Sequence, residues 1–309
     1  MNNTIDYYYS LQPDELIFRN EKYFFDCENK SYVLEKVSRP ITDIEALYNL
    51  NKVMIERNIL VHKIILNKEN SVISYIDNKP YILMEIFINK DARINLSDLC
   101  YINNSSFLIK YDNILDRHNW IKLWETKNDY FEQQINELGK KYPNLCTYAN
   151  YYIGLAENAI SYMKKVGEIK EDTFISVCSK RIDAESDLFS LYNPLNFICD
   201  YRVRDACEYI KSCFFNNKEA LDLVKKYFEN NYLSYKEALL FFARLLYPSY
   251  FFDLYDDIVN KELNENIIDK VTNKTYEYEL FLKEVYFFLS NLYRKYIPCI
   301  DWIIKRSLF

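Results

Sequence analysis

The residues best suited to metal chemistry lie between 193 and 211, where a short apolar run, 195–199, predicts a strand that delivers Asp200 at its end. A hard cation such as Mg²⁺ prefers carboxylate oxygens, and an acidic residue at a strand end, followed closely by a helix, is a frequent place for such a cation. Asp200 is therefore a candidate metal ligand. The alternative is that Asp200 pairs with Arg202 or Arg204, as charges near a strand end often do.

A helix start is indicated directly after this stretch. Asp205 stands three residues before Glu208. Behind them apolar residues repeat at helical spacing, at Ala206, Tyr209, Ile210, Cys213 and Phe214. This is the pattern of a capping box with an aspartate cap, so Asp205 and Glu208 are expected to fix the start of a helix.

The composition is that of an aromatic-rich folded protein. The chain has 309 residues, enough for two domains or lobes, and carries 30 Tyr and 20 Phe but only 3 Gly. Ordinary glycine usage is about 7%, so few loops can rely on glycine. The tyrosines exceed what a core of this size needs, so some are expected at the surface, where they could contact partners.

Charge and cysteine usage exclude several classes of protein. The net charge is −6, with 39 basic and 45 acidic residues well mixed, which argues against nucleic-acid binding. Eight cysteines form no CxxC pair and are expected to be reduced. The N-terminus has no secretory signal pattern, and the apolar stretch 238–252 is broken by Arg244 and Pro248, so no membrane span is expected. These features predict a cytoplasmic protein.

The first 89 residues predict a small antiparallel β lobe that carries one helix. Apolar runs indicate six strands, at 16–18, 23–26, 32–37, 64–66, 72–76 and 81–87. Pro40 breaks the sheet after the third strand, and Thr42 or Asp43 can cap the helix that follows. The turn before the last strand is expected at 77–80.

Residues 90–309 predict a larger, mainly helical lobe. Apolar stripes indicate helices at 120–138, 144–165, 217–230, 234–246, 249–263 and 275–296, the first of them ending at Gly139. On the long second helix, Tyr148, Tyr151 and Tyr152 are expected to face inward, and Ser234 with Glu237 forms a second capping box. A short strand-loop-strand insertion is expected at about 173–205, which begins with an apolar strand at 173–178.

Three strings in this order of elements resemble one family. They are 150–159 (NYYIGLAENA), 192–196 (YNPLN) and 202–211 (RVRDACEYIK). They resemble the bacterial endospore coat-associated kinase-like family, of the CotS and YutH type, which is similar in fold to aminoglycoside and choline phosphotransferases. The resemblance implies an α+β, two-lobed protein-kinase-like fold.

The resemblance also implies roles for residues of the insertion. Active relatives have a His-x-Asp loop, an Asn shortly after it and then a metal-binding Asp. Asp200 matches that last position, but Cys178 stands where the His would be and Lys180 where the base Asp would be. The Asn position falls near Glu185, a second metal candidate. An ammonium cannot accept a proton from an attacking hydroxyl, so this loop lacks its base.

Lys180 or Arg181 is hypothesised to pair with Asp200 and to neutralise a carboxylate that has lost its metal. The alternative is that both are solvent-facing loop charges. Cys178 could act as a nucleophile, but no His lies near it in the sequence, which favours a packing role.

The residues that contact the nucleotide in active relatives are incomplete as well. No glycine precedes Gly139, so the β lobe has no glycine-rich loop for phosphates. Active relatives carry a Lys in the third strand where this chain has Glu35, and Lys36 follows one residue late, on the other face. Glu45 matches the usual partner of that Lys. Lys36 and Glu45 are thus secondary candidates for nucleotide contacts.

Two histidines, His62 and His118, have no Cys or acidic neighbour at metal-ligand spacing, so a zinc or catalytic role is not expected.

The first functional hypothesis is a catalytically degenerate kinase-fold protein that acts as a binding or structural component in spore coat formation, with other spore-coat proteins as partners and without a cofactor. The alternative is an active ATP- and Mg-dependent small-molecule phosphotransferase, with Asp200 on Mg and Asp183 or Asp187 as the base. A third hypothesis, a helical interaction module, requires the β reading of the first 89 residues to fail. Neither nucleic acid nor membrane is an expected partner, and the sequence leaves the oligomeric state, the substrate and the shape of the interlobe cleft open.

Overall fold

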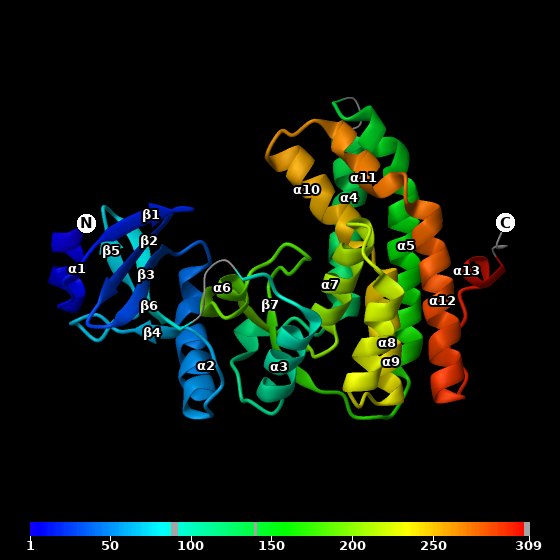
Figure 1. Cartoon of the computed structure of the whole chain (residues 1–309). Helices are drawn as coiled ribbons and strands as arrows, with labels where there is room; N and C mark the ends of the chain where they lie inside the picture. Colours follow the sequence, from blue (N-terminus) through cyan, green and yellow to red (C-terminus); the bar gives the residue numbers. More distant parts are fainter. Residues whose placement is uncertain (88–91, 139–140, 306–309) are drawn as a thin grey trace. The chain divides into compact units, whose positions relative to one another are not determined.

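The structure is a computed structural model that describes residues 1–87, 92–138 and 141–305 (Figure 1). Contacts divide the chain into two compact units. The first holds 1–116, 175–181 and 185–200, and the second holds 117–174, 182–184 and 201–309. The expected boundary near residue 89 lies outside the described residues, and the domains 1–89 and 90–309 stay a prediction.

The first unit contains a six-stranded antiparallel sheet, which confirms the expected β lobe. The order is β1-β2-β3-β6-β4, and β5 also pairs with β6. The strands are β1 (Leu16–Arg19), β2 (Lys22–Cys27), β3 (Lys30–Lys36), β4 (Lys63–Ile65), β5 (Ser74–Ile76) and β6 (Lys79–Ile86). β1 lies at one end of this order, as Figure 1 shows at the upper edge of the blue sheet.

Tight turns without glycine connect three of the hairpins. The two turn residues are Asn20 and Glu21 between β1 and β2, and Glu28 and Asn29 between β2 and β3, all with positive φ. Asp77 and Asn78 do the same between β5 and β6. Two-residue hairpin turns of the I′ type require positive φ at both positions, where glycine or asparagine is usual. Glutamate in two of them carries a conformational cost.

Helices α1 and α2 both contact the sheet. Leu34 in β3 and Leu83 in β6 share one face with Phe25, and Ile5 of α1 (Asn2–Tyr9) joins their buried cluster. α1 was not predicted. α2 (Ile44–Glu56) contacts β4.

The start of α2 corrects a sequence prediction, because its N-cap makes no side-chain hydrogen bond and the expected cap by Thr42 or Asp43 is wrong. Asp43 instead pairs with Arg39 at 3.0 Å.

The rest of the first unit includes a short two-stranded sheet formed by β7 (Ile175–Ser179) and β8 (Phe197–Tyr201). α3 (Leu96–Ser106), α6 (Leu188–Leu191) and three-residue 3₁₀ turns at 113–115 and 194–196 accompany it. α3 packs on β7, where Asn103 Nδ2 donates to Val177 O at 3.0 Å. Arg39 Nη1 donates to Phe197 O at 2.6 Å and fixes the start of β8.

The second unit is helical. Its helices are α4 (Trp120–Leu138), α5 (Pro143–Gly167), α7 (Arg204–Phe215), α8 (Ala220–Asn230), α9 (Tyr235–Leu246), α10 (Ser249–Asn260), α11 (Asp269–Thr272), α12 (Thr275–Tyr293) and α13 (Asp301–Lys305). α5 packs on α4 and α9, and α7 packs on α8 and α9. Across the described part of the chain, none of the helices has the length and apolar character needed to cross a membrane.

Several predictions for these helices can be checked. The capping box of Ser234 and Glu237 at the start of α9 is confirmed. The inward direction of Tyr148 and Tyr151 on α5 is wrong, since each is 38% exposed, whereas Tyr152 is buried. The expected helix end at Gly139 lies outside the described residues.

Candidate functional site

Asp200 lies within β8 and not after its end, because the strand runs from Phe197 to Tyr201 instead of ending at residue 199. Asp200 is only 1% exposed. Cys178 lies on the neighbouring strand β7, where its Sγ donates to Asp200 O at 3.9 Å and accepts from Asn103 Nδ2 at 3.7 Å. A buried thiol with these partners is part of the packing of β7.

Asp200 and a second carboxylate both act on a nearby tyrosine. Burial raises the pKa of Tyr111 to about 12, and the nearby groups of Asp116, Cys199 and Asp200 act in the same direction. Asp116 also forms a β-bridge with Cys199, the residue before Asp200. Two carboxylates thus act on one phenol from neighbouring backbone positions.

The residues present do not fit a resident metal. Glu185, the second metal candidate, is exposed and pairs with Arg93 at 3.4 Å. Within residues 1–87, 92–138 and 141–305, no three His, Cys, Asp or Glu side chains gather closely enough to hold a metal ion. Mg²⁺ takes six oxygen ligands in near-octahedral geometry and keeps only part of them as water. Asp200 and the nearby Asp116 do not form such a group with a third acidic side chain of the described residues.

The two alternative bases have other positions. Asp187 caps α6, where its Oδ1 accepts from the Ser190 backbone N–H at 2.7 Å. Asp183 is exposed and belongs to the second unit.

The two basic residues of this loop, Lys180 and Arg181, are both exposed. The backbone N–H of Lys180 donates to Asn196 O at 2.6 Å. Arg181 makes no ion pair with any described residue, whereas pairing of Lys180 with Asp200 stays a prediction.

Glu35 occupies the third-strand position expected for a nucleotide-contacting lysine. Its carboxylate pairs with Lys22 on β2 at 3.1 Å and accepts from Asn193 Nδ2 at 2.8 Å. Asn193 is fully buried, so the Glu35 carboxylate is held from two sides. The Lys22 ammonium also lies 4.8 Å from the centre of the Phe189 ring.

The two secondary candidates for nucleotide contacts are Lys36 and Glu45. Lys36 ends β3 and is exposed, paired in register with Tyr81. Glu45 is exposed in the first turn of α2. Neither makes an ion pair or a side-chain hydrogen bond within the described residues. A role of Lys36 and Glu45 in nucleotide contacts stays a prediction.

A small pocket lies beside the β1–β2 turn. It is lined by Arg19, Asn20, Lys22, Phe24, Asp187, Phe189 and Ser190, and its volume is about 110 Å³. Pockets that bury a drug-sized ligand usually have about 300–1,000 Å³. The Phe189 ring fills much of this side of the sheet, since it packs against Phe24 at 5.6 Å and His62 at 4.9 Å between ring centres. The pocket is too small to enclose a nucleotide.

His62 has a structural position. Its Nε2 donates to the Phe189 carbonyl at 3.0 Å, because a carbonyl can only accept, and its backbone N–H donates to Tyr192 O. Burial lowers the pKa of His62 to about 4, so the ring is neutral at pH 7. His118 packs against the ring of Tyr201.

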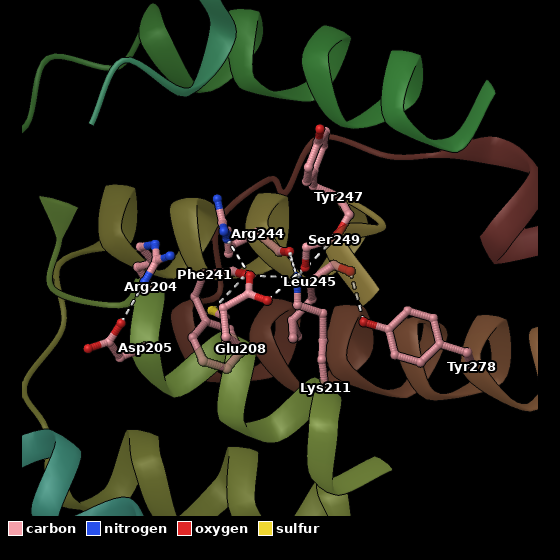
Figure 2. A network of polar contacts seen from close by, with 11 residues as sticks. Arg204, Asp205, Glu208, Lys211, Phe241, Arg244, Leu245, Tyr247, Ser249 and Tyr278 are labelled. Carbon is pink, nitrogen blue, oxygen red and sulfur yellow. Dashed lines mark hydrogen bonds and ion pairs between the residues drawn. The ribbon is translucent and has the colours of Figure 1, made fainter. Parts of the chain in front are cut away.

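A second polar cluster lies in the helical unit and corrects the opening prediction (Figure 2). α7 begins at Arg204, and its N-cap Val203 makes no side-chain hydrogen bond, so the expected capping box is wrong. Asp205 instead pairs with Arg204 at 2.8 Å. Glu208 turns toward α9 and α10, where it accepts from Arg244 Nε at 2.6 Å and from Ser249 Oγ at 2.7 Å.

Lys211 completes this cluster and was not singled out from the sequence. Its ammonium donates to Arg244 O at 3.0 Å, Tyr247 O at 3.2 Å and Ser249 Oγ at 2.5 Å, and it lies 2.8 Å from Glu208 Oε1. The first two acceptors belong to the end of α9, where carbonyls have no partner within the helix. Figure 2 shows the Lys211 side chain reaching these oxygens from α7.

The charges of this cluster stabilise one another. Burial would raise the pKa of Glu208, but Lys211 and Arg244 together outweigh it and hold that pKa below its usual value. Burial lowers the pKa of Lys211 to about 8, against the opposing effect of Glu208. At pH 7 the pair is therefore ionised. One sequence signal could have indicated it, namely the lone Arg244 in an apolar run, since a buried guanidinium needs an acidic partner.

Comparison with known proteins adds a family and a fold. The family model described as "Spore coat putative kinase YutH" matches residues 2–285. The endospore coat-associated protein YutH of Bacillus subtilis (strain 168) is 25% identical over 174 residues, which cover 51% of this chain and 51% of that protein. The chain thus matches about half the length of this curated relative.

Solved structures share the fold at low identity. Spectinomycin phosphotransferase, solved with ADP and spectinomycin, has a TM-score of 0.55 and 14% sequence identity to this chain. The match covers 94% of this chain and 97% of the phosphotransferase chain. An aminoglycoside phosphotransferase from Alicyclobacillus acidocaldarius has a TM-score of 0.57 at 11% identity and covers 92% and 94%. Choline kinase LicA from Streptococcus pneumoniae has a TM-score of 0.52 at 13% identity and covers 92% and 97%. The expected α+β, kinase-like fold is confirmed.

Proposed function

We propose, from the premise that the chain belongs to the spore coat YutH family, that this protein is a kinase-fold component of the spore coat that binds other coat proteins and transfers no phosphoryl group. The observation that carries the proposal is the state of Glu35. A carboxylate stands in the third strand, and Lys22 and Asn193 already hold it.

The sign of this charge opposes nucleotide binding. In protein kinases a lysine on the third strand contacts the phosphates of ATP, so that opposite charges meet. A carboxylate at that place repels the same phosphates. Lys22 does not replace the lysine, because its ammonium is engaged by Glu35 and lies over the Phe189 ring.

The β1–β2 turn also argues against nucleotide binding. A glycine-rich loop lets backbone N–H groups approach phosphates closely because it has no side chains in the way. Here the turn residues are Asn20 and Glu21, and Glu21 adds a second carboxylate to this edge of the sheet. The pocket beside the turn has only about 110 Å³.

The residues around the candidate metal ligand Asp200 also support the proposal. Cys178 and Lys180 stand where a catalytic loop would supply a histidine and a base, and the Cys178 thiol is buried against β8. The remaining acidic candidate, Glu185, is turned toward Arg93. Mg²⁺ in phosphotransfer sites is usually held by one or two carboxylates, and of the two candidates here only Asp200 is left.

The partner role rests on the family and on the surface. The curated relative is named as an endospore coat-associated protein, and we propose the spore coat as the location of this protein as well. Several tyrosines are well exposed, among them Tyr232 at 96%, Tyr296 at 77% and Tyr7 at 69%. Exposed tyrosines are enriched in protein interfaces because each offers a large apolar ring and a hydroxyl.

The alternative stays a prediction. An active phosphotransferase would use ATP and Mg, with Asp183 or Asp187 as the base. The cap that Asp187 provides to α6 counts against that residue, because its Oδ1 already accepts a backbone hydrogen bond at 2.7 Å.

Complementation of coat assembly tests the proposal. A spore-forming host that lacks its own copy would receive the wild-type chain, Asp200→Asn, or the control Asp222→Asn, which changes an exposed aspartate of α8. We expect all three to restore the coat equally, because no step depends on a metal-binding carboxylate. If Asp200→Asn accumulates as a folded protein but leaves the coat defective while Asp222→Asn restores it, the proposal is wrong.

A further inference from the structure

The outer edge of β1 carries apolar side chains that no other described strand covers. Ile17 is 51% exposed and Phe18 is 61% exposed, and β1 pairs only with β2 among the strands of the described residues. The opposite end of the sheet is different, because β4 has three residues and its Ile64 is buried. Proteins usually protect such edges with charges or prolines, since unpaired strand groups can bind another strand.

The pairing with β2 fixes the direction of the N–H and C=O groups of each residue in β1. Arg19 and Lys22 flank the two-residue turn and face each other, which makes them a hydrogen-bonded pair. Ile17 then also directs its N–H and C=O toward β2. Leu16 and Phe18 direct theirs away from the sheet, so these two residues offer their hydrogen-bonding groups to a further strand.

The sequence around Ile17 is complementary to itself. When two copies of this segment run antiparallel with Ile17 opposite Ile17, Leu16 faces Phe18 and Glu15 faces Arg19. In this register Leu16 and Phe18 form hydrogen-bonded pairs, because their N–H and C=O groups point away from their own sheet. Both charged residues are exposed, and each meets the opposite charge.

Other registers are less favourable. Shifting the centre to Phe18 places Glu15 opposite Glu21 of the second copy, so like charges meet. Shifting it to Leu16 places Arg19 opposite Pro13 and Glu15 opposite Ile17, so neither charge meets an opposite charge. The charges therefore select the register centred on Ile17.

We propose that the occupant of this edge is a second copy of the chain, bound through an antiparallel β1–β1 pair with Ile17 at its two-fold axis. Each Phe18 already packs on Tyr23 of its own sheet, with ring centres 4.7 Å apart, and Leu16 of the second copy extends that apolar strip. Five residues from each chain form a contact well below the usual protein–protein interface, so the dimer is weak and concentration-dependent.

Sedimentation velocity of the full chain over a wide concentration range tests this pairing. The wild-type protein is expected to shift from monomer toward dimer as its concentration rises. Ile17→Lys places two ammonium groups opposite each other and is expected to stay monomeric. The control Tyr75→Lys changes a residue of the same sheet that is 56% exposed, and it is expected to dimerise like the wild type.

A charge exchange tests the register itself. Glu15→Arg alone is expected to weaken the dimer about tenfold, because two favourable pairs become repulsive. Glu15→Arg combined with Arg19→Glu restores both pairs and the wild-type association. Circular dichroism establishes that each variant is folded. A wild-type protein that stays monomeric throughout, an Ile17→Lys variant that still dimerises, or a folded double variant that does not recover would each overturn the proposal.

Discussion

Asp200 in the sheet unit and Lys211 in the helical unit are equally buried, at 1% exposure each, but their surroundings differ. Lys211 lies among four oxygen atoms from Glu208, Ser249 and the end of α9, and its charge is balanced. Asp200 lies near Asp116 and Tyr111, and both carboxylates add to the effect of burial on the pKa of that tyrosine. The Lys211 cluster therefore joins three helices of the second unit, whereas Asp200 belongs to the short β7–β8 sheet of the first.

The largest expected effect comes from alkaline pH, which acts mainly on the helical unit. Burial raises the pKa of Tyr152 to about 12 and also raises the pKa of Tyr162, Tyr247 and Tyr278. In the unfolded chain each titrates near 10. A raised folded pKa means stability that is complete below pH 10 and is lost above it, at about 1.4 kcal/mol per tyrosine and pH unit.

We therefore expect the protein to unfold cooperatively between pH 10 and 12, with the helical unit losing its structure first. Circular dichroism and tyrosinate absorbance, followed together, measure this. Exposed tyrosines ionise near pH 10 in the folded protein, whereas the buried tyrosines should add a second step of tyrosinate absorbance at the pH at which helix is lost. Ionisation of all tyrosines near pH 10 without loss of helix would contradict the burial of these rings.

The next effect concerns the charge cluster of the helical unit. Lys211→Met removes the ammonium and leaves the carbonyls of Arg244 and Tyr247 and the Glu208 carboxylate less satisfied. Breaking a buried pair from one side costs about 3–5 kcal/mol. Urea unfolding at pH 7 should show this loss.

A matched pair gives the control for Lys211. Lys225 and Asp222 have the same i, i+3 spacing on α8 but are exposed. Lys225→Met is expected to change the free energy of unfolding by less than about 0.5 kcal/mol. Equal losses in the two variants would mean that the Lys211 cluster is no more than a surface pair.

A smaller effect is expected in the sheet unit. Glu35→Gln keeps an acceptor for Asn193 but removes the charge that pairs with Lys22, whose side chain is 22% exposed. Such partly exposed pairs contribute about 0.5–1 kcal/mol. Glu45→Gln, at an exposed position of α2, should leave the unfolding midpoint unchanged. A gain in stability for Glu35→Gln would show that the Glu35 carboxylate is strained.

The smallest expected effect is a gain. Glu28 has φ of 51° in the β2–β3 turn, a region that is unfavourable for a residue with a side chain. Glu28→Gly should stabilise the protein by about 0.5–1 kcal/mol, measured as a rise in Tm. Asn29→Gly, at φ of 63°, should gain less, because asparagine tolerates this conformation. A loss in both variants would mean that these turns bear no strain.

Much of the fold could be predicted because its signals are local. Alternating apolar residues indicated the strands of the sheet, and the stripe from Trp120 indicated α4 within its observed bounds. The capping box of Ser234 and Glu237 needs only four consecutive residues. α1 was missed because its eight residues bury only Ile5 and so carry little amphipathic pattern.

The site was harder to predict because its contacts are distant in sequence. Asp205 and Glu208 have the spacing of a capping box, but Arg244 and Ser249 bind the Glu208 carboxylate from positions 36 and 41 residues away. Likewise, the absence of a lysine at Glu35 was visible in the sequence, whereas its hydrogen bond with Asn193 spans 158 residues. Sequence spacing alone cannot reveal such pairs.

Isothermal titration calorimetry of ATP with Mg into the full chain tests the central proposal most directly, with Asp200→Asn and the exposed control Asp222→Asn titrated in parallel. We predict no Mg-dependent heat of binding for any of the three proteins, because Glu35 opposes the phosphates and no cluster of acidic side chains forms around Asp200 among the described residues. Micromolar, Mg-dependent binding by the wild type and by Asp222→Asn, abolished in Asp200→Asn, would contradict this account and favour an active phosphotransferase.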